Sequence, residues 1–314
     1  MVRIALIGAG AIGERHATAL ANIDSAELAI VVSRTEEEAG KLGSAFSVPE
    51  IGTSFETALD RTDIDAVILA TPTQMHAAQA LQCLDVGKHV LVEIPLADSW
   101  HDALTVHERA QDCPQLAMVA HTSRYYPSNQ YLRRLICAGK FDLLQMAAQT
   151  HFMRRSNLNA KGEPRVWTDH LLWHHAAHTI DLFAWQAGPI AEVQAMQGPV
   201  HPELGIAMDM CIQLKSRLGA LCTLSLSFNN DGPIGSTFRY IGDAGTYIAR
   251  RLGLEDGYGR PVDISGLGLP EDGVEVQDRD FVTAIETGKY PLTTVEDGLE
   301  AYRVIGQIEA QFHA

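Results

Sequence analysis

The stretch that decides the fold is Arg3-Ile-Ala-Leu-Ile-Gly8-Ala-Gly10-Ala11-Ile12-Gly13, an apolar segment that continues into the pattern G-x-G-x-x-G and then into a helical pattern. In a strand–turn–helix unit, Gly8 permits the tight turn, Gly10 lets a pyrophosphate approach the backbone, and Gly13 lets helix and strand pack closely. The first N–H groups of the helix then face the anion. We therefore expect residues Gly8 to Gly13 to bind a dinucleotide.

The end of the second apolar segment, Leu28-Ala-Ile-Val-Val-Ser33-Arg34, indicates which dinucleotide binds. An NAD site usually has Asp or Glu at this position to accept hydrogen bonds from the ribose, whereas here the acids follow in the next helix. A hydroxyl and a guanidinium can instead bind a 2′-phosphate. Ser33 and Arg34 thus predict NADP as the preferred cofactor, with weaker use of NAD left open because Arg34 could simply stack on the adenine.

Composition limits the class of protein. The chain has 314 residues, of which 46% are apolar, and a net charge of −15. No apolar run approaches the ~20 residues of a membrane span, and no signal peptide precedes the first strand. The five cysteines lack C-x-x-C spacing and are typical of reduced core residues. We expect a cytoplasmic protein that binds neither nucleic acid nor membrane.

The order of apolar segments predicts two domains. Up to about residue 120, short apolar strands (3–7, 28–33, 66–70, 89–92 and 116–120) alternate with helical stretches (13–21, 36–42, 75–85 and 99–111). This βαβ alternation predicts a Rossmann domain, a doubly wound parallel sheet, over residues 1–122.

Residues 123–314 predict an α+β domain. Helical stretches (128–138 and 168–186) are followed by long period-2 runs (191–196, 207–215, 219–228 and 237–249). The runs indicate a large open, mostly antiparallel sheet with one free face, and we expect a homodimer through that face. Residues 253–273 predict a loop, and helices over 278–287 and 294–312 close the chain, the last of which could return to the first domain.

Several motifs together resemble the Gfo/Idh/MocA oxidoreductase family over the whole chain. Besides the glycine fingerprint, they are Ala70-Thr-Pro-Thr-Gln-Met-His76, Glu93-Ile-Pro95, His178-Thr-Ile-Asp181, Phe281-Val-Thr-Ala-Ile-Glu-Thr-Gly288 and Asp297-Gly-Leu. The resemblance implies a nicotinamide-dependent dehydrogenase that dimerises through its C-terminal sheet. It also implies that residues around the nicotinamide include Thr71, Pro72, His76, Glu93 and Ile94.

Two positions depart from the family pattern. The family usually has Glu-Lys-Pro, with the Lys at the reacting hydroxyl, where this chain has Ile94; and it often has Asp where this chain has His174. Residues 92–100, 157–178 and 197–210 resemble a branch of the family with the same Ile, which oxidises the cyclic hemiacetal of a small dicarboxylate semialdehyde. The chemistry agrees with this departure, because a hemiacetal hydroxyl is more acidic than an ordinary alcohol and needs less help from a cation.

A dicarboxylate needs a local cationic patch in a chain of net charge −15. Residues 151–178 supply one, with three arginines and a lysine against two acids. Arg suits a carboxylate because its planar fork makes two parallel hydrogen bonds. The side chains that we expect to bind substrate are Arg124, Lys161, Arg165, Trp167, His170 and His175.

A base must accept the hydroxyl proton as hydride leaves, and His titrates near working pH. His170, His174 and His178 are spaced four apart and would form one stripe on a helix. We expect His178 to be the principal base, with His174 orienting it or sharing the proton. The same spacing can ligate a metal, but hydride transfer to a nicotinamide needs none, and we expect no metal.

Two alternatives remain. The first is another dehydrogenase of the family, acting on a sugar, an inositol or an aromatic dihydrodiol. The second is a non-catalytic NADP-sensing regulator, against which the histidine stripe argues because a sensor needs no base.

Overall fold

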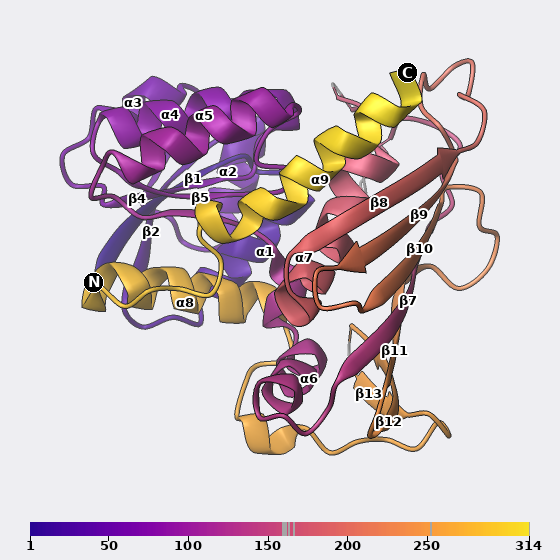
Figure 1. The fold of residues 1–314 in the computed structure, drawn as a ribbon. Coiled ribbons are helices and arrows are strands. Elements are labelled where there is room, and N and C mark those ends of the chain that lie inside the picture. The colour runs from indigo at the N-terminus through magenta and orange to yellow at the C-terminus, as the bar shows by residue number, and fades with distance from the viewer. Residues whose placement is uncertain (159–161, 163, 166, 252, 314) are drawn as a thin grey trace. The chain divides into compact units, whose positions relative to one another are not determined.

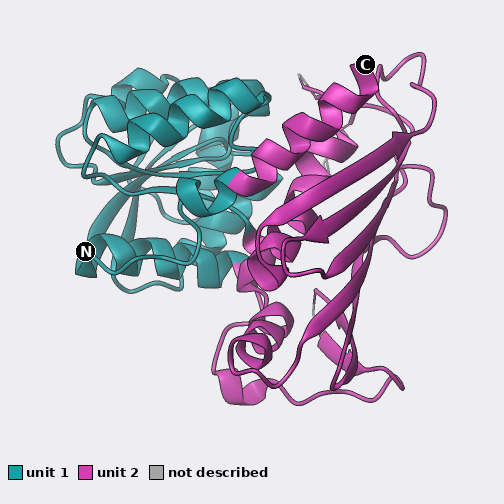
Figure 2. Ribbon diagram, viewed as in Figure 1, with its two compact units in different colours: residues 1–121, 274–299 teal, residues 122–273, 300–314 magenta. Residues whose placement is uncertain are grey.

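The computed structural model describes all residues except 159–161, 163, 166, 252 and 314. The chain divides into two compact units (Figure 2), of which unit 1 comprises Met1–His121 with Val274–Leu299, and unit 2 comprises Thr122–Gly273 with Glu300–Ala314. The first boundary lies one residue from the predicted end of the Rossmann domain. The segment Val274–Leu299, predicted within the second domain, belongs instead to unit 1.

Unit 1 is built on a six-stranded parallel sheet. Its order is β3-β2-β1-β4-β5-β6, with β1 (Val2–Ile7) and β4 (Ala66–Leu69) adjacent at the centre. The other strands are β2 (Ala26–Val32), β3 (Glu50–Gly52), β5 (His89–Val92) and β6 (Ala117–Val119). The central strands are continuous apolar runs because helices cover both faces.

The helices of unit 1 lie on both faces of this sheet. Figure 1 shows α4 and α5 over one face and α1 and α8 on the other. The bounds are α1 (Ala11–Leu20), α2 (Glu36–Ala45), α3 (Phe55–Leu59), α4 (His76–Asp85), α5 (Trp100–Gln111) and α8 (Gly273–Thr287). In this doubly wound arrangement, ligands bind at the carboxyl ends of the strands.

Unit 2 contains a seven-stranded mixed sheet in the order β13-β12-β11-β7-β10-β9-β8. All described neighbours are antiparallel except β7 and β10, which run parallel. The strands are β7 (Leu143–His151), β8 (Ile190–Gln197), β9 (Asp209–Ser216), β10 (Leu221–Ser227), β11 (Gly235–Gly242), β12 (Gly245–Arg250) and β13 (Gly253–Asp256).

Helices pack on one face of the second sheet. A π-helical turn (Leu171–Ala176) leads into α7 (Ala177–Ala187), and both contact the sheet. On β9, exposed and buried residues alternate strictly, so one face of that strand is covered and the other is open. α6 (Pro127–Cys137) packs on β12 and β13, and α9 (Val295–His313) crosses from unit 1 into unit 2 at residue 300.

The predicted fold class is confirmed, and the differences are local. The run 237–249 is two strands because Asp243 and Ala244 form a tight turn between β11 and β12. The loop predicted over 253–273 contains β13, and the predicted helix over 168–186 begins only at Leu171. Among the described residues, no helix has the length and apolar character needed to cross a membrane.

Candidate active site

The glycine turn of unit 1 has the geometry of a dinucleotide cradle. Gly8 has φ +112°, and a Cβ there would overlap the carbonyl oxygen of Ala70. A Cβ on Gly13 would overlap the carbonyl oxygen of Gly8, whereas a Cβ on Gly10 would meet nothing within 4 Å. Gly8 and Gly13 are thus needed for packing, while Gly10 borders open space at the start of α1, where N–H groups lack helical acceptors. These residues fit a pyrophosphate.

The end of β2 brings a carboxylate to the predicted 2′-phosphate residues. Ser33 Oγ donates to Glu38 Oε2 at 2.9 Å, and Arg34 Nη2 donates to Glu38 Oε1 at 2.8 Å. Glu38 lies in the first turn of α2, and its side chain reaches back to the strand end. The strand end itself carries no acid in the sequence, but the structure brings the Glu38 carboxylate of the next helix to it, which the sequence interpretation missed. The i,i+4 spacing of Arg34 and Glu38 could have indicated this contact.

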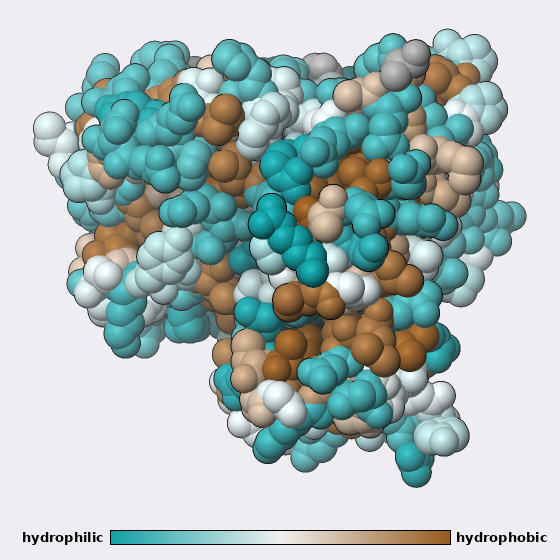
Figure 3. Space-filling view, viewed as in Figure 1, coloured by the Kyte–Doolittle hydropathy of each residue, from teal (hydrophilic) through white to brown (hydrophobic). Residues whose placement is uncertain are grey.

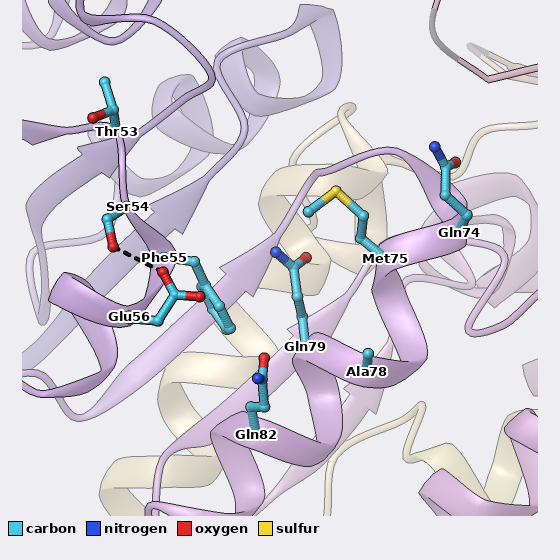
Figure 4. Close-up of a pocket in the computed structure, with 9 residues that line it drawn as sticks. All are labelled: Thr53, Ser54, Phe55, Glu56, Gln74, Met75, Ala78, Gln79 and Gln82. Atoms are coloured by element: carbon cyan, nitrogen blue, oxygen red, sulfur yellow. Dashed lines mark hydrogen bonds between the residues drawn. The ribbon is translucent and has the colours of Figure 1, made fainter.

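A cavity of about 520 Å³ lies beside this strand end within unit 1. Figure 4 shows its lining from the loop after β3 and the start of α3, and from the 3-10 turn before α4 and the first two turns of α4, with Phe55, Met75 and Gln79 among the side chains at its wall. The Ser33 N–H donates to the carbonyl of Gly52 at 3.1 Å, which places the end of β2 next to the loop that lines the cavity. An adenine-sized group fits this volume at the carboxyl edge of the sheet.

The segment after β4 is braced by His76. Its Nδ1 lies 2.7 Å from the carbonyl oxygen of Pro95 and its Nε2 lies 2.8 Å from that of Thr71. The ring is buried and joins the loops after β4 and β5, so His76 braces this turn, and its place beside the nicotinamide stays a prediction. Thr71 donates to Gln79 Oε1 at 2.6 Å, and Pro72, at the same turn, is half-buried.

A buried trio holds the predicted nicotinamide residue Glu93. His16 Nε2 lies 3.0 Å from Glu93 Oε1, and His16 Nδ1 lies 2.8 Å from Asp278 Oδ2. Burial opposes the charged imidazole, but the charges and hydrogen bonds of Asp278 and Glu93 outweigh it and raise the pKa of His16 to about 10. A cation is thus held between two carboxylates. Neither His16 nor Asp278 was predicted, because partners 262 residues apart leave no local signal.

Ile94, which replaces the family lysine, follows Glu93 directly. Its N–H donates to Glu93 Oε2 at 3.2 Å, and its apolar side chain is half-exposed. A half-exposed Ile presents a flat apolar surface where a lysine would present a charge. The structure therefore leaves Ile94 able to contact a ring.

The histidine segment of unit 2 is not one straight α-helical stripe. His170 is extended and exposed at the N-cap of the π-helical turn, so the expectation that it lies on the helix was wrong. Its backbone N–H donates to His174 Nδ1 at 3.0 Å, which places the proton of neutral His174 on Nε2. His178 follows in the first turn of α7 and is half-buried. Single π turns inside helices occur frequently at functional sites.

Asp169 is the centre of the cationic segment. It accepts hydrogen bonds from Arg154, from Arg165 Nη1 at 3.0 Å, and pairs with His175 Nε2 at 3.0 Å. Burial opposes ionisation, but the hydrogen bond with His175 and the charges of His175, His174 and Arg154 hold the pKa of Asp169 well below its usual range. Two guanidinium groups against one carboxylate leave a net positive charge. Among the described residues, no three His, Cys, Asp or Glu side chains form a metal site.

Arg154, one of the arginines of the cationic segment, is a further candidate for substrate binding. Its Nε and Nη1 are buried and have no hydrogen-bond partner within the described part of the chain, while its guanidinium lies 4.6 Å from the centre of the Phe228 ring. The neighbouring wall is aromatic, because the Trp167 ring stacks on His174 with 4.9 Å between ring centres, and the Arg165 guanidinium lies 4.9 Å from the centre of the Trp167 ring. Unused donors beside aromatic faces suit a flat anionic ligand.

Arg124, predicted to bind a substrate carboxylate, pairs with a carboxylate of the chain itself. It is buried, and its Nε and Nη2 donate to the two oxygens of Asp181 at 2.8 and 2.6 Å. This bidentate pair occupies one edge of the guanidinium, and a contact of Arg124 with a substrate carboxylate stays a prediction. Lys161, also predicted to bind substrate, lies outside the described residues.

Comparison with known proteins identifies the class. Residues 2–121 match the model of the oxidoreductase family with an NAD-binding Rossmann fold, and residues 127–268 match the C-terminal domain of bacterial oxidoreductases. The chain belongs to this Gfo/Idh/MocA oxidoreductase family and is a nicotinamide-dependent dehydrogenase that acts on a CH–OH group.

Among curated proteins, the chain is 56% identical to the 4-carboxy-2-hydroxymuconate-6-semialdehyde dehydrogenase of Sphingobium sp. strain SYK-6, over 99% of this chain and 98% of that protein. An inositol 2-dehydrogenase of Paenarthrobacter aurescens is 26% identical over 100% and 96% of the two chains.

Solved structures share the fold. A levoglucosan dehydrogenase in complex with NADH and levoglucosan has a TM-score of 0.85 at 20% identity, covering 98% of this chain and 96% of that one. An oxidoreductase of Agrobacterium radiobacter in complex with NAD+, L-tartaric acid and magnesium has a TM-score of 0.86 at 17% identity, covering 98% and 95%.

Proposed function

We propose that this enzyme oxidises the cyclic hemiacetal of 4-carboxy-2-hydroxymuconate-6-semialdehyde to 2-pyrone-4,6-dicarboxylate, in the cleavage of protocatechuate at its 4,5 bond, with NADP as the preferred cofactor. The observation that carries the proposal is the 56% identity to a dehydrogenase of that name over nearly the whole of both chains. Ile94 in place of the family lysine and the cationic segment around Asp169 support it.

For the cofactor, the amides at the start of α1 would hold the pyrophosphate, and Ser33 and Arg34 would hold a 2′-phosphate. When bound, the oxidised cofactor would supply the acceptor for the hydride that leaves the hemiacetal carbon. Glu93, fixed by His16, and the half-exposed Ile94 would lie beside the nicotinamide.

For the substrate, the unused donors of Arg154 and the fork of Arg165 would bind a carboxylate. Both guanidinium groups are set in place by Asp169, so they lose little side-chain freedom when an anion binds. A neutral polyol would leave the Arg154 donors unmet, which favours the dicarboxylate over a sugar or inositol.

For proton removal, we propose His178 as the base, with His174, four residues earlier in the chain, orienting it or sharing the proton. His174 keeps Nε2–H as donor because its Nδ1 accepts from the backbone of His170. His175 is held instead by Asp169 and lies between Phe152 and Phe228, which gives it an orienting contact with the carboxylate rather than a place beside His178.

The decisive assay measures NADP reduction by the purified protein with substrate made in place by ring cleavage of protocatechuate. Wild type is expected to form the pyrone dicarboxylate, and His178→Asn is expected to lose at least ~100-fold in kcat, in the range of general-base catalysis. His175→Asn, on the neighbouring helix face, is the matched comparison and is expected to lose less. Absence of turnover in wild type with NADP bound would favour the regulator.

We also propose that the enzyme is a cytoplasmic homodimer whose interface is the open face of the second sheet. Figure 3 shows hydrophobic and hydrophilic residues interspersed over β8, β9 and β10, and Met196 and Leu221 on these strands are 74% and 48% exposed. Light scattering after gel filtration tests the dimer, with Met196→Glu expected to yield monomers.

A further inference from the structure

The carboxylate of Glu38 occupies the two side chains that the proposed function assigns to the 2′-phosphate. Ser33 Oγ and Arg34 Nη2 donate to its two oxygens at 2.9 and 2.8 Å. The side chain of Arg34 is 66% exposed and that of Glu38 is 35% exposed, so both can rotate at the surface. One anion therefore already binds where the cofactor would bring another.

A phosphate and a carboxylate compete for these donors. Burial opposes ionisation of Glu38, but the hydrogen bonds from Ser33 and Arg34 and the charge of Arg34 together outweigh it and hold the pKa of Glu38 below its usual range, so it is charged near neutral pH. A 2′-phosphate carries between one and two negative charges and would be repelled by Glu38 at the same donors. A ribose hydroxyl, by contrast, can donate to this carboxylate.

We propose that Glu38 is a specificity-determining residue for the cofactor: its carboxylate must leave Ser33 and Arg34 before NADP binds, and it remains in place to accept a ribose hydroxyl of NAD. This inference rests on the proposed use of Ser33 and Arg34 by NADP. It means that the preference for NADP is weaker than Ser33 and Arg34 alone would give, and that both cofactors are bound.

Glu38 also has a structural role that the test must preserve. Thr35 is the N-cap of α2 and accepts from the Glu38 N–H at 3.2 Å, and the Glu38 carboxylate accepts from the backbone of Thr35. Together they form a capping box, in which Gln serves as well as Glu. Glu38→Gln therefore removes the charge and keeps the cap.

The experiment measures the dissociation constants of NADPH and NADH by nicotinamide fluorescence, which requires no substrate. Glu38→Gln is expected to bind NADPH about 10-fold tighter and NADH about threefold weaker than wild type, from loss of one like charge and of one charged acceptor. Glu37→Gln is the matched control: it removes the same charge from the same helix turn, but Glu37 is exposed and pairs with Lys41 at 2.7 Å. It is expected to change neither constant.

The ratio of the NADPH and NADH dissociation constants tests the inference. An NADPH-to-NADH ratio in Glu38→Gln equal to that of wild type or of Glu37→Gln overturns the inference, as does a change toward NADH. High salt is expected to shrink the difference, because exposed charges are screened. If the proposed reaction fails, these binding constants are still expected to change as stated, because the measurement needs no substrate. If wild type binds NADPH poorly and Glu38→Gln restores that binding, the result contradicts the NADP preference of wild type and supports the role proposed for Glu38.

Discussion

Ile94 is the residue whose chemistry most separates this chain from the common pattern of its family. Its half-exposed side chain follows the buried Glu93, and we expect it to contact the flat ring of the hemiacetal. Ile94→Lys would replace that apolar contact by a charge that the acidic hemiacetal does not need. We expect kcat/KM to fall about 10-fold, which corresponds to loss of ~1.4 kcal/mol of apolar contact. Ile94→Leu is the control, and full activity of the lysine variant would show that the apolar wall is unimportant.

Arg154 is the second residue with a specific expected effect. Arg154→Lys keeps the positive charge beside Asp169 but removes the planar fork with its unmet donors. A charged hydrogen bond contributes about 1.5–3 kcal/mol, so we expect KM for the semialdehyde to rise at least about 10-fold with little change in kcat. Arg155→Lys is the matched comparison, since the exposed Arg155 bonds to the Phe228 carbonyl and to Asn229. An unchanged KM in Arg154→Lys would remove Arg154 from the substrate site.

Among the elements, the strand–turn–helix at the start of unit 1 contains two glycines with different expected roles: Gly13 is needed for folding and Gly10 for cofactor binding. Gly13→Ala places a methyl group against the Gly8 carbonyl and is expected to cost about 1–3 kcal/mol of stability. Gly10→Ala has open space around its Cβ and is expected to leave the thermal midpoint unchanged while it weakens NADPH binding, because the methyl group occupies the approach of the pyrophosphate. Thermal unfolding and cofactor titration of both variants check this; a Gly10→Ala protein with normal affinity would contradict the cradle.

The elements that sequence predicted best are those whose pattern is local. The apolar runs of β1 and β4 are buried on both faces, so they read as strands without knowledge of their neighbours. The three-residue β3 was not predicted, because Glu50-Ile51-Gly52 is too short to show a period. The π turn before α7 and the ion pair of Arg124 with Asp181 were also not predicted, because helix type and partner choice depend on tertiary packing that no spacing encodes.

In the molecule as a whole, unit 1 is formed by segments that are far apart in the sequence, because Val274–Leu299 packs with Met1–His121. The order of apolar segments along the chain does not indicate this return. Asp278, fully buried on α8, meets His16 on α1, and His16 in turn meets Glu93 after β5. The imidazolium of His16 therefore links α1, the loop after β5 and α8. Removing it would leave two carboxylates facing each other without a cation, which costs far more than losing a surface pair.

The stability of this trio is expected to depend on pH in a defined direction. The pKa of His16 is raised from 6.5 to about 10, because Asp278 and Glu93 outweigh the effect of burial. The stabilisation is therefore complete below pH ~6.5 and is lost as pH rises toward ~10. His16→Asn is expected to lower the unfolding free energy by about 3 kcal/mol near pH 6, and the deficit relative to wild type is expected to shrink toward pH 10. Thermal unfolding followed by circular dichroism across this range measures it, with the exposed His101→Asn as control. A deficit that stayed constant with pH would mean that His16 packs as a neutral ring, and Glu93 would then be positioned by shape rather than by charge.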